Sequence, residues 1–206
     1  MRLITFGDSW TAGHGVEKNI IYKENPTPPL FIEKLREHNS WPRWTANKLD
    51  IPFVNISKCG WGNEYIYNSV KDSIKFITKD DIVVIVFSYP YRYERHNKYT
   101  PLELFNKIEE LLDGYKRFYF NGFYPLLNDV KDEVEFPKYY INPIGTLSYI
   151  LQVEELQNKK DVWEYESKSV WSDEKNYYEG DYHPNLEGYK ILGNYIYTEI
   201  KPFLNA

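Results

Sequence analysis

Short apolar runs alternate with amphipathic stretches along this chain of 206 residues, which is typical of proteins built from alternating strands and helices. The run 82–87 (IVVIVF) is continuously apolar and rich in β-branched residues. It therefore predicts a strand that is covered on both faces, as in a parallel sheet. Shorter apolar runs predict three further strands, over 3–6, 53–56 and 117–120.

Apolar residues that recur at steps of three and four predict helices between these strands and near the end of the chain. The expected helices cover 42–49, 63–77, 101–112 and 186–203. Ser40 or Trp41 lies near the start of the first, and Thr100 and Glu103 have the spacing of a capping box before the third. Strands that alternate with helices predict an α/β sandwich around a mainly parallel sheet.

The length of the chain favours a single domain over residues 1–206, because a chain of this size buries roughly 70% of the surface that it exposes when unfolded. Two long segments, 17–39 and 123–178, do not fit the alternation. The first is rich in proline, and the second is aromatic and weakly periodic. We interpret both as insertions, which often form the walls of a binding site.

Charge and composition exclude several classes of protein. The formal net charge is −5, with acids and bases interspersed, so we expect no nucleic-acid partner. No apolar stretch approaches the ~20 residues of a membrane span, and the N-terminal apolar run is too short for a signal peptide. Cys59 is the only cysteine. It can form neither an intrachain disulfide nor a cysteine-based metal site, and we expect a reducing, cytoplasmic location.

A candidate nucleophile follows the first predicted strand directly, in the segment GDSWTAG that begins at Gly7. Small residues let the chain turn sharply at the carboxyl end of a strand, where α/β proteins bind their ligands. Ser9 is expected to lie at this ligand-binding end of the strand, beside the backbone N–H groups of the first turn of a helix. Taken alone, the tripeptide Gly7-Asp8-Ser9 is equally typical of an ordinary turn.

A serine hydroxyl becomes a good nucleophile when an imidazole accepts its proton and a carboxylate orients that imidazole. Of the four histidines, only His183 combines a carboxylate two residues away, Asp181, with a place in a proline-containing turn before a helix. We therefore expect His183 to be the base and Asp181 to orient it. His14, His38 and His96 are interpreted as structural or surface residues.

The segment NISKCGWGN, residues 55–63, links the second predicted strand to the next helix. Gly60 can bring its backbone N–H close to a ligand, and Asn63 offers a side-chain amide. Such donors stabilise the oxyanion that develops during acyl transfer. Cys59 is a rival nucleophile, but no neighbour in the sequence lowers the pKa of its thiol, so we interpret it as a packing residue.

These three segments, in this order, resemble the SGNH/GDSL hydrolase family. GDSWTAG is similar to the first block of that family, NISKCGWGN to the second and DYHPN, residues 181–185, to the last. The resemblance implies a flavodoxin-like three-layer α/β/α fold. It also implies ester hydrolysis through an acyl-enzyme, without a metal or another cofactor, and an oxyanion hole that includes the backbone N–H groups of Ser9 and Gly60.

One departure from the family pattern concerns the oxyanion hole. The third block of the family usually supplies an asparagine after the third strand, whereas this chain reads SYPYR over residues 88–92. We expect Asn63, Ser88 or Arg92 to take the place of that asparagine as donor. Some phage-associated members of the family look similar at this segment, so association with a virion is an alternative to a purely cytoplasmic location.

The other departure concerns the residue that orients the histidine. The family usually has an aspartate three residues before the histidine, and Gly180 stands there in this chain. Asp181 lies two residues before His183 and Glu179 four. Asp181 is favoured, because a short side chain in a tight turn is more easily held against the imidazole.

Two functions remain open from the sequence. The favoured one is a serine esterase that hydrolyses short acyl esters, with O-acetyl groups on a carbohydrate as the expected substrate. The alternative is a structural or glycan-binding module that keeps the fold, as a component of a larger assembly, with little or no catalysis. Ser9, Asp181 and His183 favour the enzyme, whereas the missing asparagine favours the module. The oligomeric state stays open.

Overall fold

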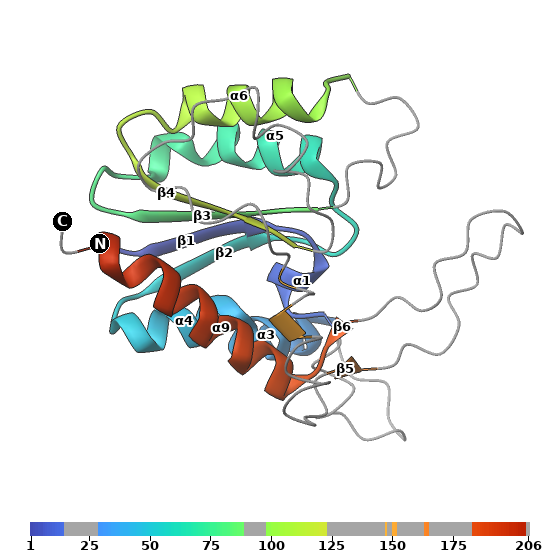
Figure 1. Cartoon of the computed structure of the whole chain (residues 1–206). Helices are drawn as coiled ribbons and strands as arrows, with labels where there is room; N and C mark the ends of the chain where they lie inside the picture. Colours follow the sequence, from blue (N-terminus) through green and yellow to red (C-terminus); the bar gives the residue numbers. More distant parts are fainter. Residues whose placement is uncertain are drawn as a thin grey trace, which may run out of the picture.

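The computed structural model describes residues 1–14, 29–88, 98–122, 147, 150–151, 163–164 and 183–204. The centre of this described part is a four-stranded parallel sheet with the order β2-β1-β3-β4 (Figure 1). Its strands are β1 (Leu3–Gly7), β2 (Phe53–Ser57), β3 (Ile82–Phe87) and β4 (Lys116–Asn121). Each lies where the hydrophobic pattern predicts it, within a residue or two at the ends.

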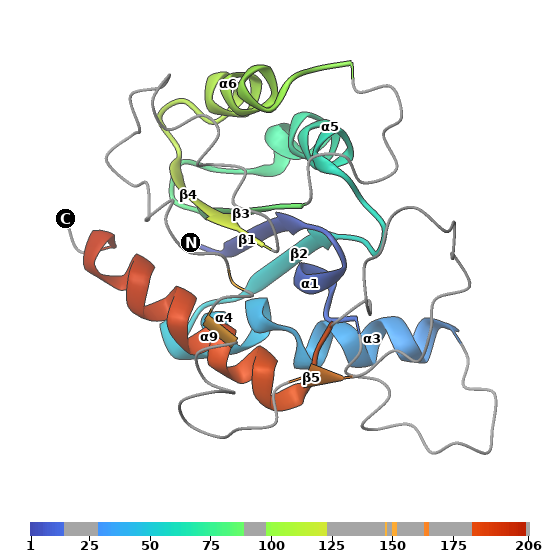
Figure 2. The same ribbon diagram turned by 45° about the vertical axis from the view of Figure 1, so that its right-hand side comes forward.

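Helices cover both faces of the sheet, which confirms the three-layer α/β/α fold (Figures 1 and 2). One face carries α5 (Asn63–Ser73) and α6 (Pro101–Leu111), and the other carries α4 (Trp41–Leu49) and α9 (Leu186–Ile200). Short 3-10 turns, Ile74–Phe76 and Lys201–Phe203, extend α5 and α9. The predicted capping box is present, since the Thr100 and Glu103 side chains each bond the backbone of the other residue.

The segment predicted as the first insertion contains a helix that the periodicity did not indicate. Residues 29–39 form α3 (Pro29–Asn39), and Ser40 separates it from α4, for which it is the N-cap residue. Residues 17–28 lie outside the described residues. Of the second segment, 123–178, the structure describes only residues 147, 150–151 and the short strand β5 (Trp163–Glu164).

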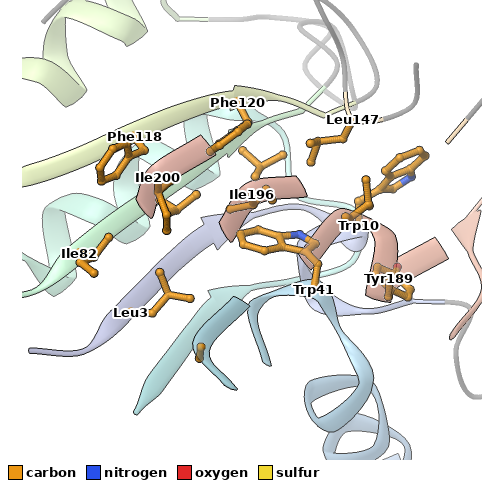
Figure 3. Close-up of a cluster of buried hydrophobic side chains, with 14 of the residues drawn as sticks. Leu3, Trp10, Trp41, Ile82, Phe118, Phe120, Leu147, Tyr189, Ile196 and Ile200 are labelled. Carbon is orange, nitrogen blue, oxygen red and sulfur yellow. The ribbon is translucent and has the colours of Figure 1, made fainter. Parts of the chain in front are cut away.

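Side chains of β3 alternate between two buried clusters, one on each face of the sheet, because successive residues of a strand point to opposite sides. Figure 3 shows the cluster beneath α9, where Leu3 and Ile82 of the sheet lie against Trp41 of α4 and Ile196 and Ile200 of α9. The other cluster joins the sheet to α5 and α6. Its aromatic members are Phe6, Phe87, Phe105 and Tyr119.

A buried carboxylate fixes the amino ends of the two central strands. Asp81 accepts hydrogen bonds from the backbone N, Nε and Nη2 of Arg2, at 2.8, 3.2 and 2.7 Å, and from the backbone N–H and hydroxyl of Thr78. The hydrogen bond from Arg2 holds the pKa of the Asp81 carboxyl well below its usual range. This anchor sets β1 beside β3 in the register that pairs Leu3 with Ile82.

The sheet order places a topological switch point between β1 and β3. The chain passes from β1 to β2 on one side and then returns to form β3 on the other. In open α/β sheets, ligands bind at the carboxyl ends of the strands where the order reverses in this way. No helix in the described part of the chain is both long and apolar enough to cross a bilayer.

Candidate functional site

Ser9 lies at the carboxyl end of β1, where it begins the one-turn helix α1 (Ser9–Ala12). Asp8 is the N-cap residue, and its Oδ1 accepts a hydrogen bond of 3.0 Å from the backbone N–H of Trp10. Gly7 makes the turn possible, because a Cβ at this position would lie 2.1 Å from Oγ1 of Thr11. The chain therefore turns directly from a buried strand into a helix start, with Ser9 buried in the turn.

A side chain of the edge strand holds α1 against the sheet. Asn55 of β2 donates from Nδ2 to the backbone carbonyl of Thr11 at 2.8 Å. Its Oδ1 accepts hydrogen bonds from the hydroxyls of Thr5, at 3.0 Å, and Ser57. Because all the polar atoms of this amide are engaged between β1, β2 and α1, the position of the helix that begins at Ser9 is tightly defined.

Ser88 and Asn63, two predicted oxyanion donors, connect the carboxyl ends of the central strands to α5. The Ser88 hydroxyl donates to Oδ2 of Asp8 at 2.7 Å. The Asn63 amide donates to the backbone carbonyl of Ser88 at 3.0 Å and accepts from its N–H at 2.8 Å. Asp8, Ser88 and Asn63 are all buried. Both predicted donors therefore lie beside the turn of Ser9, and their role towards an oxyanion stays a prediction.

Gly60 lies in the turn after β2, with a φ of 84° that favours glycine. The turn is held at the end of β1, where the backbone N–H of Lys58 donates to the carbonyl of Gly7 at 3.4 Å. The structure thus brings the second motif to the same edge of the sheet as the first. That the Gly60 N–H contributes to an oxyanion hole stays a prediction.

His183 reaches this edge from the far end of the sequence. It begins the short strand β6 (His183–Pro184), which contacts α1 (Figure 1). The side chain of His183 is buried. Asn185 caps the following helix α9, its Oδ1 accepting from the N–H of Gly188 at 2.9 Å. The elements that carry Ser9 and His183 are therefore in contact.

The position of β6 depends on how closely α9 approaches α4. Gly193 makes this approach possible, because a Cβ there would lie 2.4 Å from Cβ of Trp44. The Thr45 hydroxyl donates to the carbonyl of Gly193 at 3.1 Å. On its other side, β6 pairs with β5 in an antiparallel register that sets Glu164 opposite His183.

Three residues of the predicted site lie outside the described residues: Asp181, its rival Glu179, and the candidate donor Arg92. Their roles stay predictions. No group of three or more His, Cys, Asp or Glu side chains that could hold a metal ion occurs among the described residues.

The structure adds His14 to the site, although the sequence indicated a structural or surface residue. Its ring centroid lies 4.5 Å from that of His183, with the ring planes inclined at 63°. Nδ1 of His14 lies 3.2 Å from Sγ of Cys59, which also accepts from Nη1 of Arg36 at 3.7 Å. Cys59 therefore has two basic neighbours in space that sequence proximity did not reveal. No local motif marks His14, because its partners are distant in the chain.

Comparison with known proteins identifies the fold. No protein-family model matches the sequence, and no curated protein matches it. Several solved structures are similar over nearly the whole chain, and two of them illustrate the likeness. A lipolytic protein of the G-D-S-L family from Veillonella parvula superposes with a TM-score of 0.53, at 14% identity over 94% of each chain. An active-site mutant of a family two carbohydrate esterase from Clostridium thermocellum gives 0.51, at 16% identity over 99% of this chain.

This chain spans 64% of the length of that carbohydrate esterase. At such identities the likeness concerns the fold alone. The protein therefore has the three-layer α/β/α fold of GDSL-type proteins, as the resemblance of the motifs implied.

The two hydrogen bonds between the Asn63 amide and the backbone of Ser88, here called the clamp, lead to a prediction about stability. Asn63→Ala leaves the buried N–H and carbonyl of Ser88 without the two hydrogen bonds that they now make. We expect the free energy of unfolding to fall by about 2–4 kcal/mol, since each buried polar group left unsatisfied costs about 1–3 kcal/mol. Urea unfolding measures this loss.

Asn47→Ala is the matched control, because Asn47 is exposed on α4. It should change the free energy of unfolding by no more than about 0.5 kcal/mol. Equal stability of the two variants would contradict the role assigned to the clamp.

Proposed function

We propose that this protein is a serine esterase in which Ser9 is the nucleophile and His183 is the base. The observation that carries the proposal is the contact between α1, which begins at Ser9, and β6, which begins at His183. This contact lies at the carboxyl edge of a parallel sheet, beside its switch point. Two elements from opposite ends of the sequence, one carrying Ser9 and the other His183, are in contact there. The fold is shared with lipolytic proteins and carbohydrate esterases.

The reaction has two halves. His183 accepts the hydroxyl proton of Ser9 as Oγ attacks the ester carbonyl, and the tetrahedral intermediate collapses to an acyl-enzyme. The leaving alcohol takes the proton from His183. Water then takes part in the second half. His183 removes a proton from water, the resulting hydroxide attacks the acyl carbon, and the acid leaves as His183 returns the proton to Oγ of Ser9. Asp181 holds the imidazole in the productive tautomer.

The oxyanion is stabilised in this proposal by the backbone N–H groups of Ser9 and Gly60 and by a third donor. The hydrogen bonds favour Asn63 over Ser88 for that third role. A serine hydroxyl has one hydrogen, and that of Ser88 is donated to Asp8. A primary amide has two, and Asn63 donates one of them to Ser88. Arg92 is the remaining candidate.

The described surface supports a small acyl group on a sugar better than a long acyl chain. Few large apolar side chains are exposed on it. They are Met1, Val54, Tyr65 and Phe76. Tyr65, near the start of α5, is 56% exposed, and Trp61 lies just before this helix. Tyrosine and tryptophan combine an apolar face with a polar tip, which suits sugar rings. We therefore propose O-acetylated carbohydrate as the substrate class.

A second candidate function is a glycan-binding module with little catalysis. The observation that favours it is the hydrogen bond from Ser88 to Asp8, which uses a hydroxyl at the place where the family supplies an oxyanion donor. In that case the same edge of the sheet binds sugar and Ser9 does not react.

The nucleophile and base are tested by substitution. Ser9→Ala and His183→Ala should each lower the hydrolysis of p-nitrophenyl acetate by at least about 1000-fold, and the double variant should be hardly worse, because the pair acts as a unit. The melting temperature of each variant shows whether it is folded, and Ser69→Ala, on the exterior of α5, is the control. Full activity of Ser9→Ala would refute this assignment, and an inactive wild-type protein would favour the binding module.

The orienting acid is tested by three isosteric changes. Asp181→Asn should lower kcat by about a thousandfold or more, since the imidazole then adopts the wrong tautomer. Glu179→Gln and Glu164→Gln should stay within about threefold of the wild-type value, because neither acid orients the imidazole in this proposal. A large loss in Glu164→Gln instead would move the orienting role to β5, where this residue lies opposite His183.

The acyl group is tested with a series of chain lengths. We expect acetate to be preferred over octanoate by at least about tenfold in kcat/KM, or roughly 1.4 kcal/mol in transition-state binding. Few large apolar side chains of the described residues are exposed, which leaves little apolar surface to bind a long chain. Comparing p-nitrophenyl acetate, butyrate and octanoate under identical conditions gives the ratio. A rise in efficiency towards octanoate would refute the short-acyl proposal.

A further inference from the structure

We propose that His14 is a positioning residue for His183, and that its ring keeps the imidazole of His183 in the orientation needed to accept the proton of Ser9. This inference rests on the function proposed above for Ser9 and His183. The observation behind it is the direct contact of the two rings, whose centroids are 4.5 Å apart and whose planes are inclined at 63°.

The ring of His183 needs an external constraint. Rotation of a histidine ring about the Cβ–Cγ bond has broad, shallow preferences, so the side chain alone does not fix where its nitrogens point. A general base must hold one nitrogen within hydrogen-bond reach of the proton that it accepts. The inclined contact with His14 restricts rotation of the His183 ring because rotation would drive one ring into the other.

His14 can act in this way because it is itself held on several sides. Its backbone N–H donates to the carbonyl of Ser9 at 3.0 Å, and its carbonyl accepts from the hydroxyl of Tyr189 at 2.8 Å. Its Nδ1 lies 3.2 Å from Sγ of Cys59, directly before Gly60. One residue thus joins the turn of the nucleophile, the helix that follows His183 and the turn of a proposed oxyanion donor.

The contact with Cys59 defines a competing interpretation. A thiol 3.2 Å from an imidazole is also the arrangement of a cysteine nucleophile with its base. Positioning and nucleophilic catalysis differ in what each substitution does. Positioning requires the ring of His14 and survives loss of the sulfur. A Cys59–His14 pair requires both the sulfur and the imidazole nitrogen.

The test compares His14→Ala with His14→Phe, which keeps an aromatic ring at the contact. His14→Ala should lower kcat for p-nitrophenyl acetate by on the order of 10- to 100-fold, with KM within about twofold, as for a small misplacement of a catalytic group. His14→Phe should recover at least about a third of the wild-type kcat, and Cys59→Ala should stay within about fivefold. His38→Ala, an exposed histidine of α3, is the control and should be unchanged.

A double-mutant cycle shows whether His14 acts through His183. The rate at which a fluorophosphonate labels Ser9 should fall in His14→Ala, whereas in the His183→Ala background the same substitution should have less than about a twofold effect. An equal loss in both backgrounds would overturn the proposal, and so would a folded His14→Ala with wild-type kcat. If His14→Phe and Cys59→Ala both abolish turnover, the positioning role is wrong and Cys59 is the nucleophile.

The two levels of the proposal fail separately. Wild-type activity in Ser9→Ala or His183→Ala refutes the proposed function itself. Loss of activity in both of those variants, with a fully active His14→Ala, refutes the role of His14 alone.

Discussion

The hydrogen bond from the hydroxyl of Ser88 to the carboxylate of Asp8 joins the carboxyl ends of the two central strands. The rest of the candidate site depends on this hydrogen bond. Asp8 caps the helix that begins at Ser9, and Ser88 is clamped on both backbone atoms by Asn63 at the start of α5. A buried carboxylate is costly unless its oxygens are satisfied, and here the network that satisfies them also fixes the turn of the nucleophile.

The opposite side of the site is set by helix packing rather than by the sheet. The glycine at position 193 lets α9 approach α4 closely, and β6, which precedes α9, contacts α1. His183 lies three residues before Leu186, the first residue of α9, and belongs to β6. The serine and the histidine are therefore positioned by two separate sets of contacts. His14 bridges them, because its backbone bonds both Ser9 and Tyr189 of α9.

Much of the fold could be predicted from the sequence because its signals are local. Each signal lies within the segment whose secondary structure it predicts. Examples are the β-branched run of β3, the capping box at the start of α6 and the periodicity of α9. The helix α3 was not predicted, because prolines near its start resemble a loop signal, although proline is compatible with the first turn of a helix.

The candidate site could be predicted only in outline. Ser9 and His183 stand in recognisable motifs at strand and helix ends, and such ends converge in a parallel sheet. His14 contacts Cys59 and His183, which are far from it in the sequence, and no short motif encodes such tertiary contacts. The bond from Ser88 to Asp8 likewise depends on strand order, which periodicity along one strand does not contain. Tertiary contacts of this kind are therefore accessible only once the strand order and helix packing are known.

The most direct test of the central claim is to identify the residue that reacts with a fluorophosphonate. The folded protein is incubated with the reagent, digested, and mapped by mass spectrometry. We expect a single adduct, on Ser9. It should disappear when the protein is unfolded before treatment, because the base and the serine then separate. The absence of an adduct on the folded protein, or an adduct on another residue, would contradict the claim that Ser9 is an activated nucleophile.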